Sequence, residues 1–126
     1  MFALRGDLGA GKTTFVQGFL KGLGSRARVT SPTFILMRRY RLKGKKFSNV
    51  FHIDAYRLKT PGHLSALELG AVFADPRSIV LVEWPERAGR LLPKNSTRVT
   101  FAHGKKENER IVAITMPPPP APKKHP

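Results

Sequence analysis

Apolar residues recur at helical spacing close to the N-terminus. Four of them lie at positions i, i+4, i+5 and i+8, and so on one face of a helix: Phe15, Phe19, Leu20 and Leu23. Gly24 follows at a position typical of a helix C-terminal cap. We therefore predict a helix over residues 13–24. A second, shorter helix is predicted over residues 63–70, because Pro61-Gly62 breaks the chain before it and Gly70 ends it.

Short apolar runs bounded by turn residues predict strands. They cover residues 2–4, 34–40, 50–54, 78–83, 98–101 and 110–115. The run 78–83 is uninterrupted until its final carboxylate, which suits a strand buried on both faces. Lysine-rich residues 43–46 separate two of the runs and predict an antiparallel hairpin, and a second hairpin is expected over 98–115. The chain therefore combines a strand and a helix at its start with hairpins further along.

The loop between the first strand and the first helix carries a nucleotide-binding motif. Residues 6–13 match the P-loop pattern G-x-x-x-x-G-K-[ST]: Gly6, Asp7, Leu8, Gly9, Ala10, Gly11, Lys12 and Thr13. Glycines allow the backbone to turn its N–H groups towards an anion, and the first turn of the helix, with Thr14, adds its dipole. Lys12 is expected to reach the β- and γ-phosphates and the Thr13 hydroxyl to bind Mg²⁺. The alternative is a glycine-rich turn that only joins strand to helix.

Two carboxylates stand at strand ends, where the metal ion and the attacking water of a P-loop enzyme are held. Glu83 ends the apolar run 79–82, as expected of a Walker B element, and Asp54 ends the run 50–53. Ligands of open α/β sheets bind outside such strand ends. Asp54, Glu83 and Lys12 are therefore the candidate catalytic residues. The alternative is that either acid only pairs with a nearby arginine, such as Arg57.

The charge balance adds a possible partner. The 126 residues include 23 Lys and Arg but only 8 Asp and Glu, a formal net charge of +15. Such a surface suggests a polyanion, and nucleic acid is the obvious candidate, although a solvated lysine-rich loop would look the same. With no cysteine in the chain, disulfides and cysteine–zinc sites are excluded. No signal peptide or membrane-spanning run is found, so we expect a cytoplasmic protein without a membrane partner.

Several motifs together resemble one family. They are GDLGAGKTTF at residues 6–15, VTSPTF at 29–34, HIDAYRL at 52–58, ELG at 68–70 and VEWPE at 82–86. Their order and spacing are similar to those of the TsaE (YjeE) family, bacterial ATPases required for threonylcarbamoyladenosine modification of tRNA. The resemblance covers roughly residues 1–115. It implies a small P-loop NTPase fold of the α/β class, in three layers with a mixed parallel and antiparallel central sheet.

The resemblance also implies activity, partners and residue roles. A weak intrinsic ATPase that acts with TsaB and TsaD is expected, with ATP and Mg²⁺ bound and tRNA reached indirectly or through the basic surface. Lys12 would bind phosphates, Thr13 and Glu83 would hold Mg²⁺, and Asp54 would assist with the metal or the attacking water. Thr33 would sense the γ-phosphate. Trp84, the only tryptophan, would contact nucleotide or a partner, or else anchor the core.

The two ends of the chain depart from the family pattern. Family members carry a strand and a helix before the P-loop strand, whereas Met1 here lies within that strand, so we expect uncovered apolar sheet surface. Residues 1–116 form the expected domain. Residues 117–126 contain six prolines and are expected to form a disordered tail.

Two other functions stay open at this point. One is a small P-loop kinase that acts on a metabolite, although no acceptor-binding motif is evident beside the 41–46 loop that would serve as its lid. The other is a module that uses nucleotide only as a conformational ligand, without catalysis.

Overall fold

The computed structural model describes residues 1–7, 9–29, 37–44, 46–56, 66–89 and 92–117. Its strands are β1 (Phe2–Arg5), β2 (Met37–Arg41), β3 (Asn49–Asp54), β4 (Ser78–Glu83), β5 (Thr97–His103) and β6 (Arg110–Thr115). Its helices are α1 (Lys12–Gly22), α2 (Ala66–Ala74) and the short 3₁₀ helix η1 (Pro85–Arg87). None of the helices in these segments is long and apolar enough to cross a membrane.

All six strands form one sheet in the order β2-β3-β4-β1-β5-β6. The central strands β3, β4, β1 and β5 run parallel, and the outer strands β2 and β6 pair antiparallel with β3 and β5. Both predicted hairpins are therefore confirmed, and they form the two edges of the sheet. The predicted α/β class with a mixed sheet is also confirmed. Because β3, β4 and β1 are parallel neighbours, their carboxyl ends meet at one edge.

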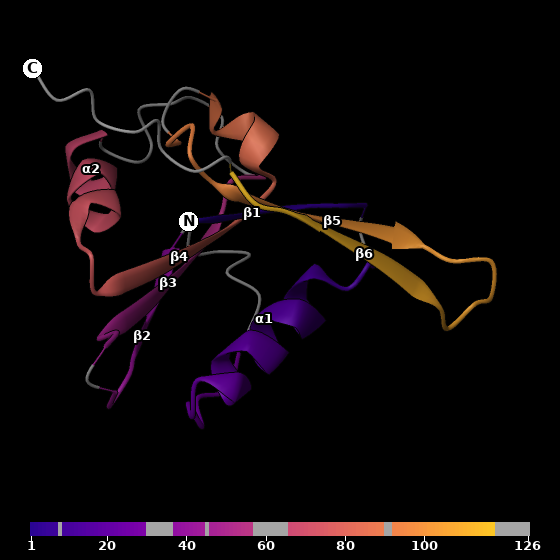
Figure 1. Cartoon of the computed structure of the whole chain (residues 1–126), viewed down its shortest axis with the longest axis horizontal. Coiled ribbons are helices and arrows are strands. Elements are labelled where there is room, and N and C mark those ends of the chain that lie inside the picture. Colours follow the sequence, from indigo (N-terminus) through magenta and orange to yellow (C-terminus); the bar gives the residue numbers. More distant parts are fainter. Residues whose placement is uncertain (8, 30–36, 45, 57–65, 90–91, 118–126) are drawn as a thin grey trace, which may run out of the picture.

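The two helices cover opposite faces of this sheet (Figure 1). The core on the α1 face includes Val16 and Leu20 of the helix together with Leu4 and Leu81 of the central strands. The core on the α2 face includes Leu69 with Val80 and Val82. Successive residues of β4 alternate between the two cores, as a strand with period two requires. The continuous apolar run 79–82 is thus explained by burial on both faces, and the three-layer prediction is confirmed.

The helical face of α1 differs from the prediction. Val16 and Leu20 are fully buried, whereas Leu23 is 38% exposed and lies beyond the last helical residue. Phe15 and Phe19 lie at the margin of the core, where their rings contact Phe101 and Phe2. The predicted face is therefore confirmed for Leu20 and, at the margin of the core, for Phe15 and Phe19. Leu23 does not belong to it, and the buried Val16 was not predicted. The predicted cap at Gly24 is confirmed, with φ of +83°.

The second helix was predicted too early in the chain. Gly70 was expected to end it, but α2 continues through Gly70 to Ala74, because the apolar residues Val72 and Phe73 extend its packing against the sheet. Residues 63–65 lie outside the described part of the chain, as do residues 34–36 of the strand predicted over 34–40. The expected tail over 117–126 also falls almost wholly outside it.

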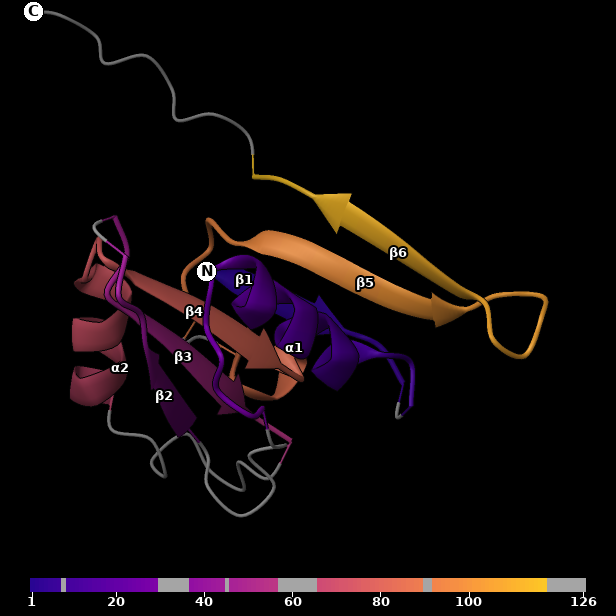
Figure 2. The ribbon, with the colours of Figure 1, turned by 90° about the horizontal axis from the view of Figure 1, so that it is seen from below.

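The β5–β6 hairpin extends beyond the two helices (Figure 2). On β5, Val99 and Phe101 are buried, but every residue of the outer strand β6 is exposed. Ile111, Val112 and Ile114 are the large apolar side chains concerned, with exposed fractions of 56%, 46% and 61%. An apolar, uncovered strand thus forms one edge of the sheet.

Candidate functional site

The P-loop joins the end of β1 to the start of α1, and its glycines have different structural roles. Gly11 precedes the helix with φ of +107°, a left-handed conformation that residues with a Cβ rarely adopt. At Gly6 the constraint is space, since a Cβ there would lie 2.9 Å from the Phe101 carbonyl oxygen of β5. Helix α1 has no side-chain cap and no acidic residue in its first turn. Its N-terminal N–H groups are therefore suited to an anion.

Lys12 is buried although it carries the P-loop ammonium group. Only 5% of the residue is exposed. Its Nζ donates a hydrogen bond of 2.7 Å to the Gly6 carbonyl and lies 3.5 Å from the centroid of the Trp84 ring. Burial lowers the pKa of this ammonium, and the negative charge of Glu83, followed by Glu86, opposes that shift. A phosphate would provide the full negative charge that these contacts lack.

The two predicted acids lie side by side at the carboxyl edge of the sheet. Asp54 of β3 is the register partner of Glu83 of β4, and Glu83 in turn is the register partner of Leu4 in β1, directly before the P-loop. Glu83 has the strand parity of Leu81, and Asp54 that of Val50, and both of those residues pack on the α1 face. The fold therefore brings both carboxylates to the P-loop side of the sheet.

Glu83 is held by a histidine that the sequence analysis did not select. His52 Nε2 lies 2.6 Å from Glu83 Oε2, with His52 fully buried and the Glu83 side chain 7% exposed. Within the described part of the chain, His52 Nδ1 has no hydrogen-bond partner. A proton on Nδ1 would be buried and unsatisfied, so we assign the proton to Nε2, which donates to the carboxylate. Glu83 thus contacts a histidine, while Arg57, the arginine considered as an alternative partner, lies outside the described residues.

Two aromatic side chains, Trp84 and Tyr56, lie next to each other on one side of the site, and Trp84 contacts Lys12. Trp84 has φ of +57°, in the left-handed region where a bulky residue is uncommon. Its ring lies over Lys12 and 5.0 Å from the ring of Tyr56, on which the Arg87 guanidinium stacks at 4.6 Å. Asp54 Oδ1 accepts the Tyr56 N–H at 2.9 Å. Trp84 also packs against the α2-side core, so it takes part in both the core and the site.

A hollow of about 430 Å³ is lined by residues of the P-loop and of the β5–β6 hairpin. One wall is formed by Gly9, Gly11 and Thr14, and the opposite wall by Phe101 and Arg110 of the β5–β6 hairpin. Arg110 Nη2 also donates to the Gly9 carbonyl at 3.4 Å. The hairpin therefore lies close enough to the P-loop to contact whatever is bound there.

The fold thus gathers most of the predicted site. Lys12, Asp54, Glu83 and Trp84 meet beside the P-loop. Leu8 and Thr33 lie outside the described residues, as does Arg57. His52 and Tyr56 lie in the HIDAYRL motif of residues 52–58, but neither was predicted as a residue of the nucleotide site. Arg87 and Arg110 were not predicted, because only the fold brings them to Tyr56 and Gly9.

No group of three or more His, Asp or Glu side chains able to hold a metal is found among the described residues. Magnesium is usually bound by one or two protein ligands together with phosphate oxygens and water. The half-buried Thr13 in the first turn of α1 and the strand-end acids Glu83 and Asp54 are oxygen ligands of the kind that this pattern requires. This set of donors suits a metal that arrives with a nucleotide.

Comparison with known proteins identifies one family of relatives. The family model described as threonylcarbamoyl adenosine biosynthesis protein TsaE matches residues 1–112. A Haemophilus influenzae protein named tRNA threonylcarbamoyladenosine biosynthesis protein TsaE is 42% identical over 94 residues, which are 75% of this chain and 57% of the relative. A Bacillus subtilis protein of that name is 31% identical over 115 residues, 91% of this chain and 68% of the relative.

The structural comparison agrees. The crystal structure of Bacillus subtilis YdiB has a TM-score of 0.69 and 31% identity, and the match covers 93% of this chain and 68% of that chain. The chain spans a little over half the length of the Haemophilus influenzae protein it matches. Since the family model matches residues 1–112, and the Bacillus subtilis relative is 31% identical over 91% of this chain, the chain belongs to the TsaE family.

Proposed function

We propose that this chain binds ATP with Mg²⁺ at the P-loop and hydrolyses it, as the ATPase component of tRNA threonylcarbamoyladenosine biosynthesis. One observation carries the proposal. The Lys12 ammonium, an uncapped helix N-terminus and two strand-end carboxylates converge at one edge of the sheet. A chain of phosphates complements the cationic part of this site, and a divalent ion complements its carboxylates.

Each residue has a distinct task in this proposal. Lys12 exchanges the Gly6 carbonyl and the Trp84 ring for phosphate oxygens, which stabilises the charge that develops during transfer. The Thr13 hydroxyl and Glu83 hold the metal, and His52 keeps the Glu83 carboxylate oriented. Asp54 orients a water. When bound, Mg²⁺ neutralises negative charge on the phosphates. Thr33, outside the described residues, is the proposed γ-phosphate contact.

The hollow beside the P-loop is the proposed place for the nucleoside. Phe101 offers an aromatic ring and Arg110 a guanidinium, both suited to a base or a ribose. Replacing Arg110 with alanine should weaken ATP binding about two- to fivefold, the effect of one exposed polar contact. Binding of inorganic tripolyphosphate should be unchanged. Equal loss for both ligands in calorimetry would contradict this placement.

Calorimetry and phosphate release test the central proposal. The wild type should bind ATP in the presence of Mg²⁺, and Lys12→Ala should lose that binding. Glu83→Gln keeps an acceptor for His52 and should still bind ATP, but without turnover. We propose homologues of TsaB and TsaD as partners, and hydrolysis should increase when they are added. Binding without turnover in their presence would favour the non-catalytic module, whereas transfer of phosphate to a small acceptor would favour the kinase.

A further inference from the structure

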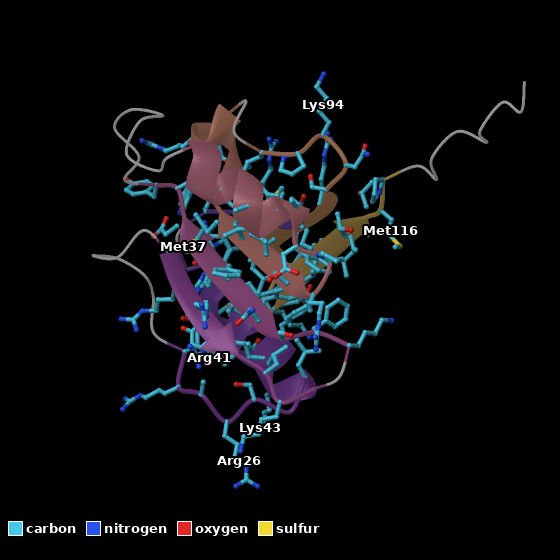
Figure 3. The ribbon with its side chains drawn as sticks, turned by 90° about the vertical axis from the view of Figure 1, so that its left-hand side faces the viewer. Arg26, Met37, Arg41, Lys43, Lys94 and Met116 are labelled. Carbon is cyan, nitrogen blue, oxygen red and sulfur yellow. The ribbon has the colours of Figure 1, made fainter. Side chains whose placement is uncertain are left out.

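A hollow surface lies at the far end of α1, where the residues after the helix meet the turn between β2 and β3. Two adjoining hollows, of about 600 and 680 Å³, share the lining residues Ser25, Arg26 and Ala27. Figure 3 shows Arg26, Arg41 and Lys43 together at this end of the molecule. We call this surface the basic cleft. Its cationic lining residues are Lys21, Arg26, Arg28, Arg41 and Lys43.

The cations of the basic cleft have no acidic residue near them in sequence. Residues 8–53 contain no Asp or Glu, but they contain ten basic residues: Lys12, Lys21, Arg26, Arg28, Arg38, Arg39, Arg41, Lys43, Lys45 and Lys46. Among the described residues, the ion pairs are Arg5–Glu86 and His52–Glu83, and both lie elsewhere. All five lining cations are exposed. Their positive charge is therefore concentrated and, in the described segments, not balanced by an ion pair, which attracts a polyanion.

The backbone of the cleft offsets this charge only by the partial negative charge at the C-terminal end of α1. At the end of α1, the Ser25 N–H donates to the Leu20 carbonyl and the Gly24 N–H to the Lys21 carbonyl, each at 3.0 Å. These two bonds form a Schellman closure, which satisfies carbonyls that would otherwise present negative ends to the cleft. On the other wall, Leu42 N–H donates to the Ser48 carbonyl at 2.8 Å. Both walls are thus ordered, and the groups they present are mainly guanidinium and ammonium donors.

We propose that the basic cleft binds the phosphodiester backbone of RNA. Three of its five cations are arginines, whose forked donors suit phosphate. No aromatic side chain lines it, which argues against base stacking and against insertion into a lipid surface. The contact should therefore be insensitive to base sequence and strongly dependent on salt. Among polyanions, RNA is favoured because the chain belongs to a family described by its role in forming a modified nucleoside.

The basic cleft lies well away from the nucleotide site. Lys12 is the first residue of α1, whereas the cations of the cleft lie in the last turn of the helix, after it, or on the β2–β3 side. With 11 residues the helix is about 16 Å long. RNA can therefore occupy the cleft while the P-loop is filled. This inference goes beyond the proposed ATPase function and does not depend on it.

Binding of a fluorescently labelled, unmodified tRNA transcript tests the proposal by anisotropy over a range of salt concentrations. The cleft variant carries Arg26→Gln, Arg28→Gln and Lys43→Gln. A matched control carries Lys94→Gln, Lys105→Gln and Lys106→Gln, which removes the same charge from exposed loops elsewhere. The cleft variant should bind at least about tenfold more weakly, with a salt slope smaller by about 2, because about three phosphate contacts are lost. The control should change by about twofold or less.

Three results would overturn the proposal. The first is that the wild type does not bind the transcript even at low salt. The second is an equal loss of affinity for the transcript in both variants, which would show diffuse attraction by net charge. Polyglutamate could displace the transcript at equal charge concentration, which would indicate an acidic protein as the partner. ATP binding by calorimetry is measured on each variant, and unchanged ATP affinity shows that the fold and the P-loop site are intact. Failure of ATP binding in the wild type would affect the ATPase proposal alone.

Discussion

Replacing His52 with leucine removes the hydrogen-bond donor that holds the Glu83 carboxylate. The two side chains meet at 2.6 Å, and Glu83 retains only 7% exposure. In the variant, water cannot readily replace the lost donor, so a carboxylate is left buried without its partner. A hydrogen bond to a charged group contributes about 1.5–3 kcal/mol, and the unpaired acceptor brings the expected loss towards the upper value. We expect His52→Leu to lower the free energy of unfolding by about 2–3 kcal/mol.

Urea unfolding followed by circular dichroism measures this loss, and His52→Gln provides the control. Glutamine carries a donor nitrogen at about the same reach as Nε2, so it should recover more than half of the loss. A double-mutant cycle with Glu83→Leu, which removes the acceptor, isolates the pair, and a coupling of about 1 kcal/mol or more is expected. A leucine variant within about 0.5 kcal/mol of the wild type, or a coupling near zero, would refute the reasoning that His52 holds Glu83.

The other predictions concern the P-loop, the tryptophan and an exposed turn. Gly6→Ala should lower the free energy of unfolding by about 1–3 kcal/mol, because the new Cβ would lie 2.9 Å from a backbone oxygen of β5; equal urea midpoints for variant and wild type would contradict this. Lys12→Met should change the emission spectrum of Trp84, since Nζ lies 3.5 Å from its ring centroid, and identical spectra would count against that contact. Hydrogen bonds from a backbone N–H and then from the Ser78 hydroxyl lower the pKa of Asp75. Its contribution to stability is therefore present above the ordinary value of 3.8 and lost as pH falls through the folded pKa. Asp75→Ala should be less stable than the wild type at neutral pH but not in strong acid, and an equal difference at both pH values in urea titrations would contradict this.

Local patterns were sufficient where the determinant is local. The P-loop is read from eight consecutive residues, and both acids were found because each ends an apolar run. The fully buried strand β4 was recognised for the same reason. Hairpins at both edges followed from pairs of short runs with turn residues between them. These features depend on residues within a few positions of each other, so they can be predicted without knowledge of the tertiary contacts.

Boundaries and helix faces were less well predicted. Leu23 looked apolar enough for the core, but α1 ends before it and leaves it exposed. Gly70 looked like a helix terminator, but packing against the sheet carries α2 past it. In both cases a tertiary contact, or the lack of one, overrode a local preference.

The sequence by itself therefore determined the chemical types present: a phosphate-binding loop, two strand-end acids and a long acid-free basic segment. Only the tertiary structure decided which of them meet. His52 lies 31 residues from Glu83, and the register of β3 against β4 brings them together. The carbonyl oxygen of Phe101 in β5 leaves no room for a Cβ at residue 6, which is why glycine stands there. The ring of Trp84 lies over Lys12, which is 72 positions earlier in the chain. The physical reason is that hydrogen bonds and close packing act over a few ångströms of space. The parallel pairing of strands distant in the chain, such as β3 with β4 and β1 with β5, sets those distances, and no turn between adjacent runs predicts it.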